Sequence, residues 1–459
     1  MRDVILLSFI ALCLAAALRY PFAGLLTWAW FTLMTPHQAA FGVFGLPLNL
    51  IIAAVTITAY VLSGEASRFK MDAITKLLLA FLGWLTISQA FSLDPENSAP
   101  YYDRLFKTVI FVLLCAQMAS DKLRFNALVW TLVLGIGFFA AKGALFTFAT
   151  LGAYRVQGLP NTVLEDNNHF GIAVATILPL ILYLRGQASR PWLRQGLLAL
   201  FCLSVVAIIG THSRGAFLAL LAFGGFFWMR SKHKISIVAG LTLLMIPTIA
   251  FMPAKWTERM STIGEATQDA SFMGRVDAWV INYKLAETNP LTGAGLRNSY
   301  HEDIAKTVDP ARAETAKAAH SIYFEILGGA GFVGLALYLS IFAAAFLGAR
   351  KILSARDSPA MAPWKSDFAS YGQLSLMIFM VGGASTSMEM WDGYLIVIAL
   401  IAALTKMTPQ HVANRGSALE AIRKTNWRRK QRLKDVFTNE SASRLTAPTS
   451  QSLSPSDHS

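Results

Sequence analysis

Long apolar runs, separated by short polar segments, follow one another along the chain from Val4 to Leu404. A helix needs about 20 consecutive apolar residues to cross a bilayer, and the runs have about that length. The pattern therefore predicts an all-α polytopic membrane protein with 12 or 13 transmembrane helices. The predicted spans are residues 4–18, 21–34, 46–63, 75–92, 107–119, 125–149, 169–184, 196–210, 215–229, 235–251, 322–348, 370–387 and 391–406.

The first two runs are separated only by Arg19 and Tyr20, so they form either two short helices or one broken span. The start of the chain resembles a signal peptide, but Arg19-Tyr20-Pro21 follows where a cleavage site would have small residues. We therefore expect a retained membrane segment.

Composition excludes several classes of protein. Hydrophobic residues make up 54% of the chain and charged residues 15%, whereas an average soluble domain has about 25% charge. A net charge of +13 would favour nucleic-acid binding in a soluble protein, but in a membrane protein it indicates basic cytoplasmic loops. The three cysteines lie inside apolar runs without metal-ligand spacing, and no Walker, GxGxxG or HExxH motif is present. We therefore expect no metal, no cofactor and no nucleic-acid partner.

The basic short loops all fall on one side of the predicted membrane, at residues 68–70, 122–124, 185–194, 230–234 and 350–351. Because lysine and arginine resist translocation, we expect this side to be the cytoplasm. The alternating loops then face the periplasm of a bacterial inner membrane. The longest of them, 252–320, has mixed charge, and helical spacing from Arg275 to Glu287 before Asn289-Pro290 predicts a short helix inside it.

Three regions follow from this pattern: an N-terminal transmembrane bundle, 1–195, a transmembrane core, 196–406, that includes the periplasmic loop 252–320, and a tail, 407–459. The tail is first basic and then rich in Ser, Thr and Pro. We expect a cytoplasmic anchor on an anionic leaflet followed by a disordered end, because the tail lacks the interleaved aromatic residues of a nucleic-acid site.

Two arginines are candidates for binding an anion at the outer side. Arg214 lies in the string Thr-His-Ser-Arg-Gly between two apolar runs, and Arg275 opens the helix of the long loop. A guanidinium presents five donors in a plane, which suits a phosphate or a carboxylate. The alternatives are that Arg214 only reaches the lipid headgroups and that Arg275 is only solvated.

His320 stands at the other end of the loop, immediately before the apolar run that starts at Ile322. An imidazole at that boundary can act as a general base, although a single histidine there can also be structural. Glu325 lies about one helical turn into the span, where an ionisable group is costly and is a candidate for function. Its alternative is to reach back to the membrane surface.

The loop from Tyr154 to His169 adds further polar groups. Arg155, Asp166, Asn167 and Asn168 are candidates for binding sugar hydroxyls. Residues of the Asp and Asn type also cap helices, so the same residues can have a structural role.

Four short strings flank the long loop in order: Thr211-His212-Ser213-Arg214-Gly215-Ala216, Gly274-Arg275 with Trp279, Asn289 to Leu296, and Ala319 to Ile326 with Gly331 to Gly334. Together they resemble the O-antigen ligase and O-antigen polymerase family over residues of about 200 to 345. The N-terminal strings Arg19-Tyr20-Pro21-Phe22, Thr35-Pro36-His37 and Glu165-Asp166-Asn167-Asn168 further resemble O-glycosylation ligases found with exosortase systems.

This resemblance implies transfer of a glycan from an undecaprenyl-diphosphate carrier at the periplasmic face, onto lipid A-core sugar in lipopolysaccharide ligases or onto a protein hydroxyl in relatives. It implies that Arg214 and Arg275 bind the donor diphosphate and that His320 deprotonates the acceptor. The chain has Ser321 where many ligases have Asn, so the hydrogen bonding around His320 departs from the family pattern.

The chemistry of the residues agrees with a metal-independent, inverting displacement, because two arginines can stabilise the departing diphosphate. An O-antigen polymerase uses the same donor and is the nearest alternative. A secondary transporter or flippase is the rival from another class, but transporters place their sites near the midplane in repeated halves. Here the polar residues cluster at the outer ends of the spans, and the halves show no repeat.

Overall fold

The computed structural model describes residues 2–43, 45–230, 270–314 and 317–408, with scattered positions between 235 and 257. Within these ranges the chain is helical and contains no strand, which confirms the all-α prediction. Most of the predicted span 235–251 and the tail from residue 409 onward lie outside the described residues.

Twelve helices of the described chain correspond to the other predicted spans. They are α1 (Arg2–Arg19), α2 (Pro21–Met34), α3 (Leu48–Leu62), α4 (Ala73–Ala90), α5 (Pro95–Met118), α6 (Lys122–Ala149), α7 (Asn167–Gln187), α8 (Pro191–Gly210), α9 (Arg214–Arg230), α15 (Ile322–Ser354), α16 (Pro363–Gly383) and α17 (Asp392–Met407). Short 3-10 helices, η1 (Pro36–Ala39), η2 (Phe41–Val43) and η3 (Glu65–Arg68), connect some of them.

Five of the described helices, α4, α6, α7, α8 and α15, have both the length and the apolar composition of a membrane span. Three further apolar helices are shorter, at Pro21–Met34, Leu48–Leu62 and Arg214–Met229. The chain is thus a polytopic membrane protein, and the total of 12 or 13 spans stays a prediction. Residues 4–34 form two helices, because the chain breaks at Tyr20 and restarts with Pro21 in the first turn of α2.

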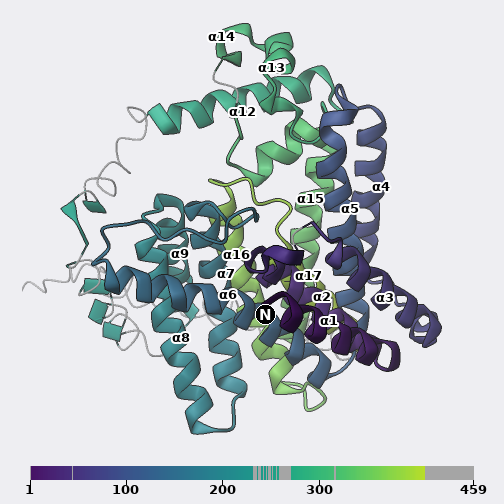
Figure 1. Ribbon diagram of the computed structural model, residues 1–459, viewed down its shortest axis with the longest axis vertical. Coiled ribbons are helices and arrows are strands. Elements are labelled where there is room, and N and C mark those ends of the chain that lie inside the picture. The colour runs from purple at the N-terminus through teal and green to yellow at the C-terminus, as the bar shows by residue number, and fades with distance from the viewer. Residues whose placement is uncertain are drawn as a thin grey trace, which may run out of the picture.

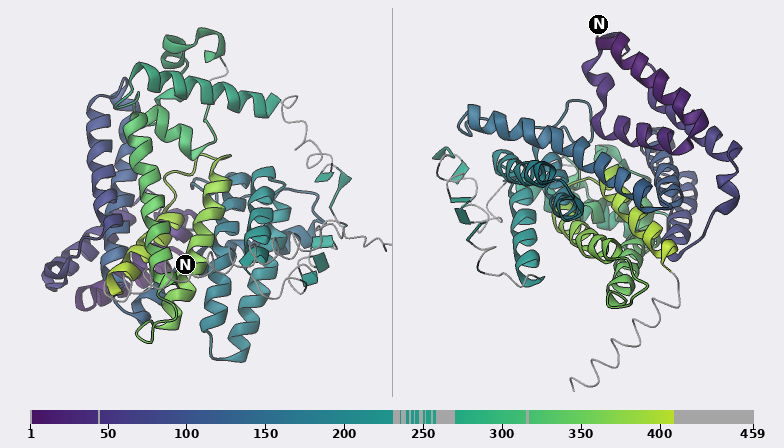
Figure 2. Two further views of the ribbon diagram at one scale, coloured as in Figure 1. Left: turned by 180° about the vertical axis from the view of Figure 1, so that it is seen from behind. Right: turned by 90° about the horizontal axis from the view of Figure 1, so that it is seen from below.

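Two helices lie at the centre of the bundle. Every residue of α17 from Asp392 to Leu404 is buried, and α7 is buried from Phe170 to Ile181. Helices without a polar face belong inside a bundle, and α7 packs against α6, α8, α9 and α16 while α17 packs against α5, α15 and α16. The helices α1 to α3 lie on one flank and α8 and α9 on the opposite one (Figures 1 and 2).

The span predicted at residues 107–119 starts too late, because α5 begins at Pro95 and most of the segment between the spans 75–92 and 107–119 is helical rather than loop. Asp94 caps the helix by accepting a hydrogen bond from the amide of Asn97 at 3.1 Å. The polar first turn is held from outside the helix, since Nδ2 of Asn97 donates to Oδ1 of Asn298 at 3.1 Å. Just before the helix, the amide of Leu93 donates to the carbonyl of Ala294 at 2.9 Å. Tertiary contacts therefore extend the helix where hydrophobicity alone gives no signal.

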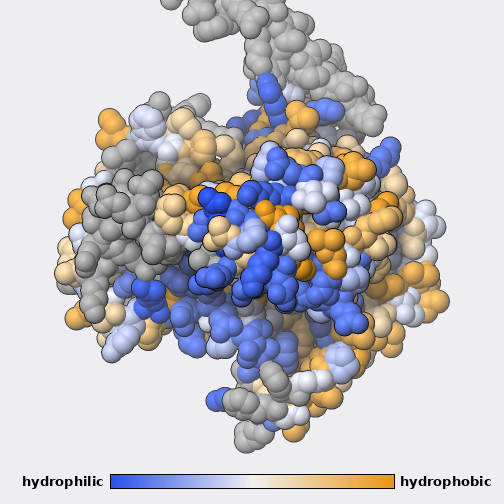
Figure 3. All heavy atoms as spheres, turned by 90° about the horizontal axis from the view of Figure 1, so that it is seen from above, coloured by the Kyte–Doolittle hydropathy of each residue, from blue (hydrophilic) through white to orange (hydrophobic). Residues whose placement is uncertain are grey.

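The long loop forms a small helical module that lies across one end of the bundle (Figure 1). Its helices are α12 (Ala270–Thr288), which confirms the predicted helix, η5 (Asn298–Tyr300), α13 (Glu302–Val308) and α14 (Pro310–Ala313). Ile281, Leu285 and Ala305 belong to its small apolar core. Hydrophilic residues gather at the centre of this face and hydrophobic residues around its margin (Figure 3).

Helix α15 is broken at Gly331, whose φ of 70° and ψ of −174° are not helical. The freed carbonyls of Gly328 and Gly329 accept hydrogen bonds from the amides of Ala294 and Gly295, at 2.8 and 3.1 Å. Only glycine fits at position 331, because a Cβ there would lie 2.2 Å from the carbonyl oxygen of Leu291. The loop after α12 therefore satisfies the backbone at the break, as a membrane helix requires.

Candidate functional site

The 384–391 turn, which joins α16 to α17, is the point where the candidate residues meet. Most of it is buried, including Thr386, Ser387 and Glu389, whose side chains are at most 4% exposed. The turn lies at the same end of the bundle as α12 and the start of α15, since both contact it through hydrogen bonds described below.

Arg275 and His320 both contact this turn. Nη1 of Arg275 donates to the carbonyl oxygen of Ser385 at 3.4 Å, and the amide of His320 donates to Oγ of Ser387 at 3.1 Å. Trp279, one turn after Arg275 on the same face of α12, donates from Nε1 to the carbonyl of Ala319 at 2.7 Å. Helix α12 is therefore fixed against both the turn and the segment that carries His320.

Arg214 is the first residue of α9, and that end of the helix also packs on the turn. A Cβ built on Gly215 would lie 2.2 Å from Oγ of Ser385, so this close approach requires glycine. The side chain of Arg214 is half-buried. The structure thus gathers the three principal predicted residues, Arg214, Arg275 and His320, around one short segment that the sequence did not single out.

Glu325 is buried and holds the backbone next to His320. Its Oε1 accepts hydrogen bonds from the amide of Ala319 at 2.9 Å, from the hydroxyl of Tyr300 at 2.7 Å and from Oγ of Ser387 at 2.5 Å. The side chain is only 3% exposed, so it does not reach back to the membrane surface. This geometry favours a positioning role for Glu325.

His320 has an unusual backbone and an unusual acidity. Its φ is 46°, a left-handed conformation that costs free energy for a residue other than glycine and often marks a functional site. Burial, and then the nearby charge of Arg275, lowers the pKa of His320 to about 4, with His169 acting in the same direction and Asp166 opposing it. At neutral pH the imidazole is therefore uncharged and able to accept a proton.

The predicted glycan-binding residues Asp166, Asn167 and Asn168 form the N-terminal cap of α7. Asp166 accepts hydrogen bonds from the amides of Asn168 and His169 at 2.8 and 3.3 Å. Nδ2 of Asn167 donates to the carbonyl of Thr211 at 2.7 Å, and Oδ1 of Asn168 accepts from Ser213 at 2.7 Å. These contacts match the capping alternative, and they tie the start of α7 to the turn before Arg214.

No observed contact links Arg155 to the 384–391 turn or to the cap of α7. Its side chain is exposed and makes no hydrogen bond or ion pair with the described residues. Among these residues there is also no group of three His, Cys, Asp or Glu side chains placed to hold a metal ion.

The sequence did not predict the ion pair between Arg297 and Glu389, which lies beside the turn. Nη2 of Arg297 donates to Oε1 of Glu389 at 3.0 Å, and the guanidinium lies 4.8 Å from the ring centre of Tyr101 and 5.6 Å from that of Tyr300. Burial opposes the charge of Arg297, but Glu389 and Tyr300 raise its pKa above the ordinary value. A carboxylate within the apolar string before Trp391 was the one signal that could have indicated this pair.

A cavity of about 1020 Å³ opens next to the turn. Its walls come from α2, α3, α5 and the segment 159–164, and they include Trp391 and Asp392 at the end of the turn. Most of the lining is apolar, for example Phe31, Ile57 and Phe111. The cavity therefore lies between helices of the N-terminal half of the chain and the end of the turn.

Comparisons with known proteins assign the central part of the chain. Residues 197–339 match the family model described as O-antigen ligase, and residues 1–189 match a family of unknown function, DUF5935. Residues 197–339 thus form an O-antigen ligase family region within this chain. No curated protein matches it.

The O-antigen ligase match contains Arg214, Arg275, His320 and Glu325, and it also contains Arg297. The cap of α7 belongs to the match of unknown function. Glu389 and the 384–391 turn lie after both matched regions, so the candidate site of this O-antigen ligase relative combines three parts of the chain.

Proposed function

We propose that this protein transfers a glycan from an undecaprenyl-diphosphate carrier to an acceptor hydroxyl at the periplasmic face of the inner membrane. The acceptor is a lipid A-core sugar or a protein. The observation that carries the proposal is the gathering of Arg275, His320 and the start of α9 around Ser385 to Ser387.

The two arginines have the charge that the leaving group requires. When the bond between the sugar and the diphosphate breaks, its electron pair stays on the diphosphate oxygen, which gains negative charge. Arg214 and Arg275 would bind this diphosphate, and fixed donors at the site of developing charge supply a large part of catalysis in many enzymes. The second cation also offsets the repulsion between the two phosphates.

His320 would take the proton of the acceptor hydroxyl as its oxygen attacks the anomeric carbon. The lowered pKa of His320 keeps the imidazole neutral at pH 7, so it can accept that proton. A single displacement of this kind inverts the configuration of the anomeric carbon. Glu325 would keep the segment in place through its hydrogen bonds to Ala319 and Ser387.

The cavity beside the turn is the place that we propose for the isoprenoid chain of the carrier. Its wall is largely apolar and ends at Trp391 and Asp392, after the turn whose start, at Ser385, contacts Arg275. Most of this wall, at α2, α3 and α5, belongs to residues 1–189, the region that matches the family of unknown function.

The experiment compares purified wild-type protein with Arg275→Ala in liposomes that contain a lipid-linked glycan donor and an acceptor. The matched control is Arg194→Ala, which removes an exposed arginine of α8 outside the turn. Loss of one donor to the developing charge should lower kcat by about 10²–10³-fold in Arg275→Ala and leave the control unchanged. Equal rates in all three proteins would overturn the proposal.

The glycan products of a deletion strain separate ligation from polymerisation. Intact lipid-linked polymer that is not attached to its acceptor indicates a ligase, whereas single repeat units indicate an O-antigen polymerase. Flux of the lipid-linked glycan in liposomes without any acceptor would instead indicate a flippase.

A further inference from the structure

A second pocket lies at the opposite end of the bundle from the 384–391 turn. Helix α17 begins at this turn and ends at Met407, and its 16 residues span about 24 Å. The pocket has a volume of about 690 Å³ and is formed by the ends of α3, α5 and α17 and the starts of α6 and α16. It includes residues of two of the five basic loops that the sequence places at the cytoplasm, 68–70 and 122–124.

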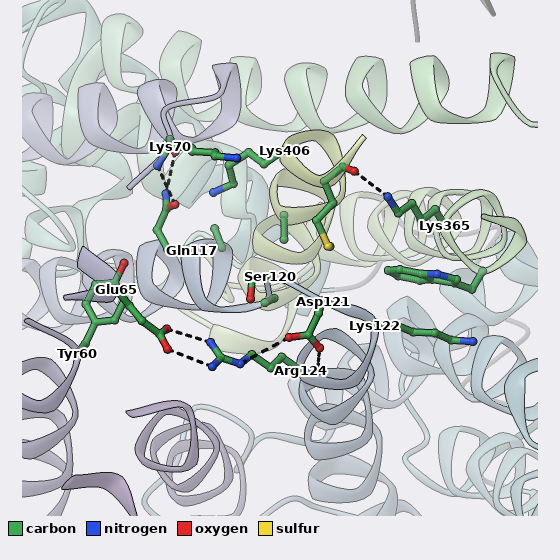
Figure 4. Close-up of a pocket in the computed structure, with 15 residues that line it drawn as sticks. Tyr60, Glu65, Lys70, Gln117, Ser120, Asp121, Lys122, Arg124, Lys365 and Lys406 are labelled. Atoms are coloured by element: carbon green, nitrogen blue, oxygen red, sulfur yellow. Dashed lines mark hydrogen bonds and ion pairs between the residues drawn. The ribbon is translucent and has the colours of Figure 1, made fainter. Parts of the chain in front are cut away.

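The lining of this pocket is strongly basic. Five basic and two acidic side chains contribute to it, which leaves an excess of three positive charges. The basic ones are Lys70, Lys122, Arg124, Lys365 and Lys406, and the acidic ones are Glu65 and Asp121 (Figure 4). An excess of this kind inside a concave site attracts anions.

Arg124 pairs with both carboxylates, so neither of them pairs with a lysine. Its two terminal nitrogens pair with the two oxygens of Glu65 at 2.9 and 3.1 Å, and its Nε lies 3.7 Å from Oδ2 of Asp121. Figure 4 shows this arginine between the two acids, with the lysines on the other sides of the pocket. None of the four lysines forms an ion pair within the described part of the chain.

Lys406 provides an independent observation that points to an anion in this pocket. Its ammonium nitrogen is buried and has no hydrogen-bond partner. Asp72, the carboxylate that acts on it most strongly, is occupied by the amide of Thr75 at 3.1 Å and by the hydroxyl of Thr405 at 3.0 Å. A buried charge without a partner is costly, so an anion in the pocket would remove that cost.

The remaining donors surround the same space. Lys365 donates to the carbonyl of Met407 at 2.7 Å, which leaves its other ammonium hydrogens available. Helices α6 and α16 both start at the pocket, and the positive ends of their dipoles add to the field. Lysine is suited to phosphate as a compact point charge.

We propose that this pocket binds a phosphate group, either that of an anionic phospholipid headgroup or the free ion. Basic pockets between membrane helices at the cytoplasmic side are suited to acidic headgroups, and the surface potential of that leaflet concentrates such lipids. The bound phosphate group contacts α5, α6, α16 and α17 at the end of the bundle remote from the 384–391 turn. The site is separate from the proposed transfer reaction and does not depend on it.

The experiment measures the thermal stability and the bound lipid of full-length protein in nanodiscs. The first arm compares phosphatidylcholine with a mixture that contains phosphatidylglycerol. The second arm adds inorganic phosphate to phosphatidylcholine discs at constant ionic strength. The variants are Lys406→Gln and Lys70→Gln, and the control is Lys351→Gln, which removes an exposed lysine at the end of α15 outside the pocket.

We expect phosphatidylglycerol to raise the unfolding temperature of the wild type and of Lys351→Gln, and native mass spectrometry to detect it on both. Each pocket variant should bind the lipid about fivefold more weakly, which corresponds to one basic residue near an anionic surface. Without the anionic lipid, Lys406→Gln should be at least as stable as the wild type, because it removes a buried, unpaired charge. Stabilisation by inorganic phosphate alone would identify the free ion as the ligand.

Two results would overturn the proposal. One is that neither phosphatidylglycerol nor inorganic phosphate raises the unfolding temperature of the wild type and that no phosphatidylglycerol is found bound to it. The other is that the pocket variants respond as strongly as Lys351→Gln, which would show that the lipid acts on the whole basic face.

Discussion

The pH dependence of glycan transfer tests the environment that the fold creates for His320. The pH is changed from 7.5 to 5.5 and kcat/KM for glycan transfer is measured at each pH. This ratio is chosen because it reports the ionisation of the free protein. Burial and Arg275 lower the pKa of His320 to about 4. An ordinary histidine has a pKa of about 6.5.

The difference is large enough to measure. At pH 5.5 an imidazole with a pKa of about 4 is still about 97% neutral, whereas one with a pKa of about 6.5 is only about 9% neutral. The structure therefore predicts an almost constant kcat/KM down to pH 5.5, where an ordinary histidine would give a roughly tenfold loss. A midpoint near pH 6.5 in the wild type would refute the reasoning.

Arg275→Gln supplies the second half of this test. Removing the positive charge should move the midpoint upward, and it should stay below 6.5 because burial, the larger cause, remains. The variant is slower overall, so the midpoint and not the rate is compared. A midpoint unchanged by the substitution would contradict the electrostatic explanation.

The stability of the folded protein must be measured at each pH as well, because the lowered pKa of His320 also lowers the free energy of unfolding at acidic pH. Below pH 6.5 the unfolded chain takes up a proton on this histidine before the folded chain does, so the free energy of unfolding falls as the pH drops towards 4. Thermal unfolding at each pH separates this loss from a loss of catalysis. His320→Gln should be free of this part of the pH dependence.

Three further substitutions test the packing around the site. Gly215→Ala should reduce transfer and lower the unfolding temperature, since its Cβ would lie 2.2 Å from Oγ of Ser385. Adding Ser385→Ala should restore part of the transfer rate and of the unfolding temperature. If the double variant recovers neither, the close approach of Gly215 to Ser385 is unimportant. Arg297→Ala should destabilise the protein by about 3–5 kcal/mol in thermal unfolding, because it leaves Glu389 buried without its partner, and Arg297→Met with Glu389→Leu should recover most of that loss. Ala53→Trp should fill the apolar cavity and raise KM for donors with a long isoprenoid chain, and an equal effect on short-chain donors would place the chain elsewhere.

Periodicity and composition were sufficient for the helices that are apolar along their whole length. They were insufficient for α5, whose first turns are polar and are stabilised by contacts with residues more than 190 positions away, such as the hydrogen bond of Asn97 to Asn298. The break in α15 has a related cause. The sequence analysis drew no break from the glycines at 328, 329 and 331, and only the loop around Ala294 explains how the carbonyls at the break are satisfied.

The candidate site was predictable where a charged residue stands out at the edge of an apolar run. Arg214 and His320 were found in this way, and the structure brings the segments that carry them to the 384–391 turn. The turn itself was missed because its Ser and Thr residues are common in any loop. The partnership of Arg297 with Glu389 joins residues 92 positions apart, and neither position alone indicates the other.

The transfer rate of purified His320→Ala tests the central claim most directly. The donor is the lipid-linked glycan, and donor binding is measured separately to show that the arginines still hold the diphosphate. Loss of a general base should lower kcat by about 10²–10⁴-fold while donor affinity stays near that of the wild type. Transfer at the wild-type rate would contradict the account.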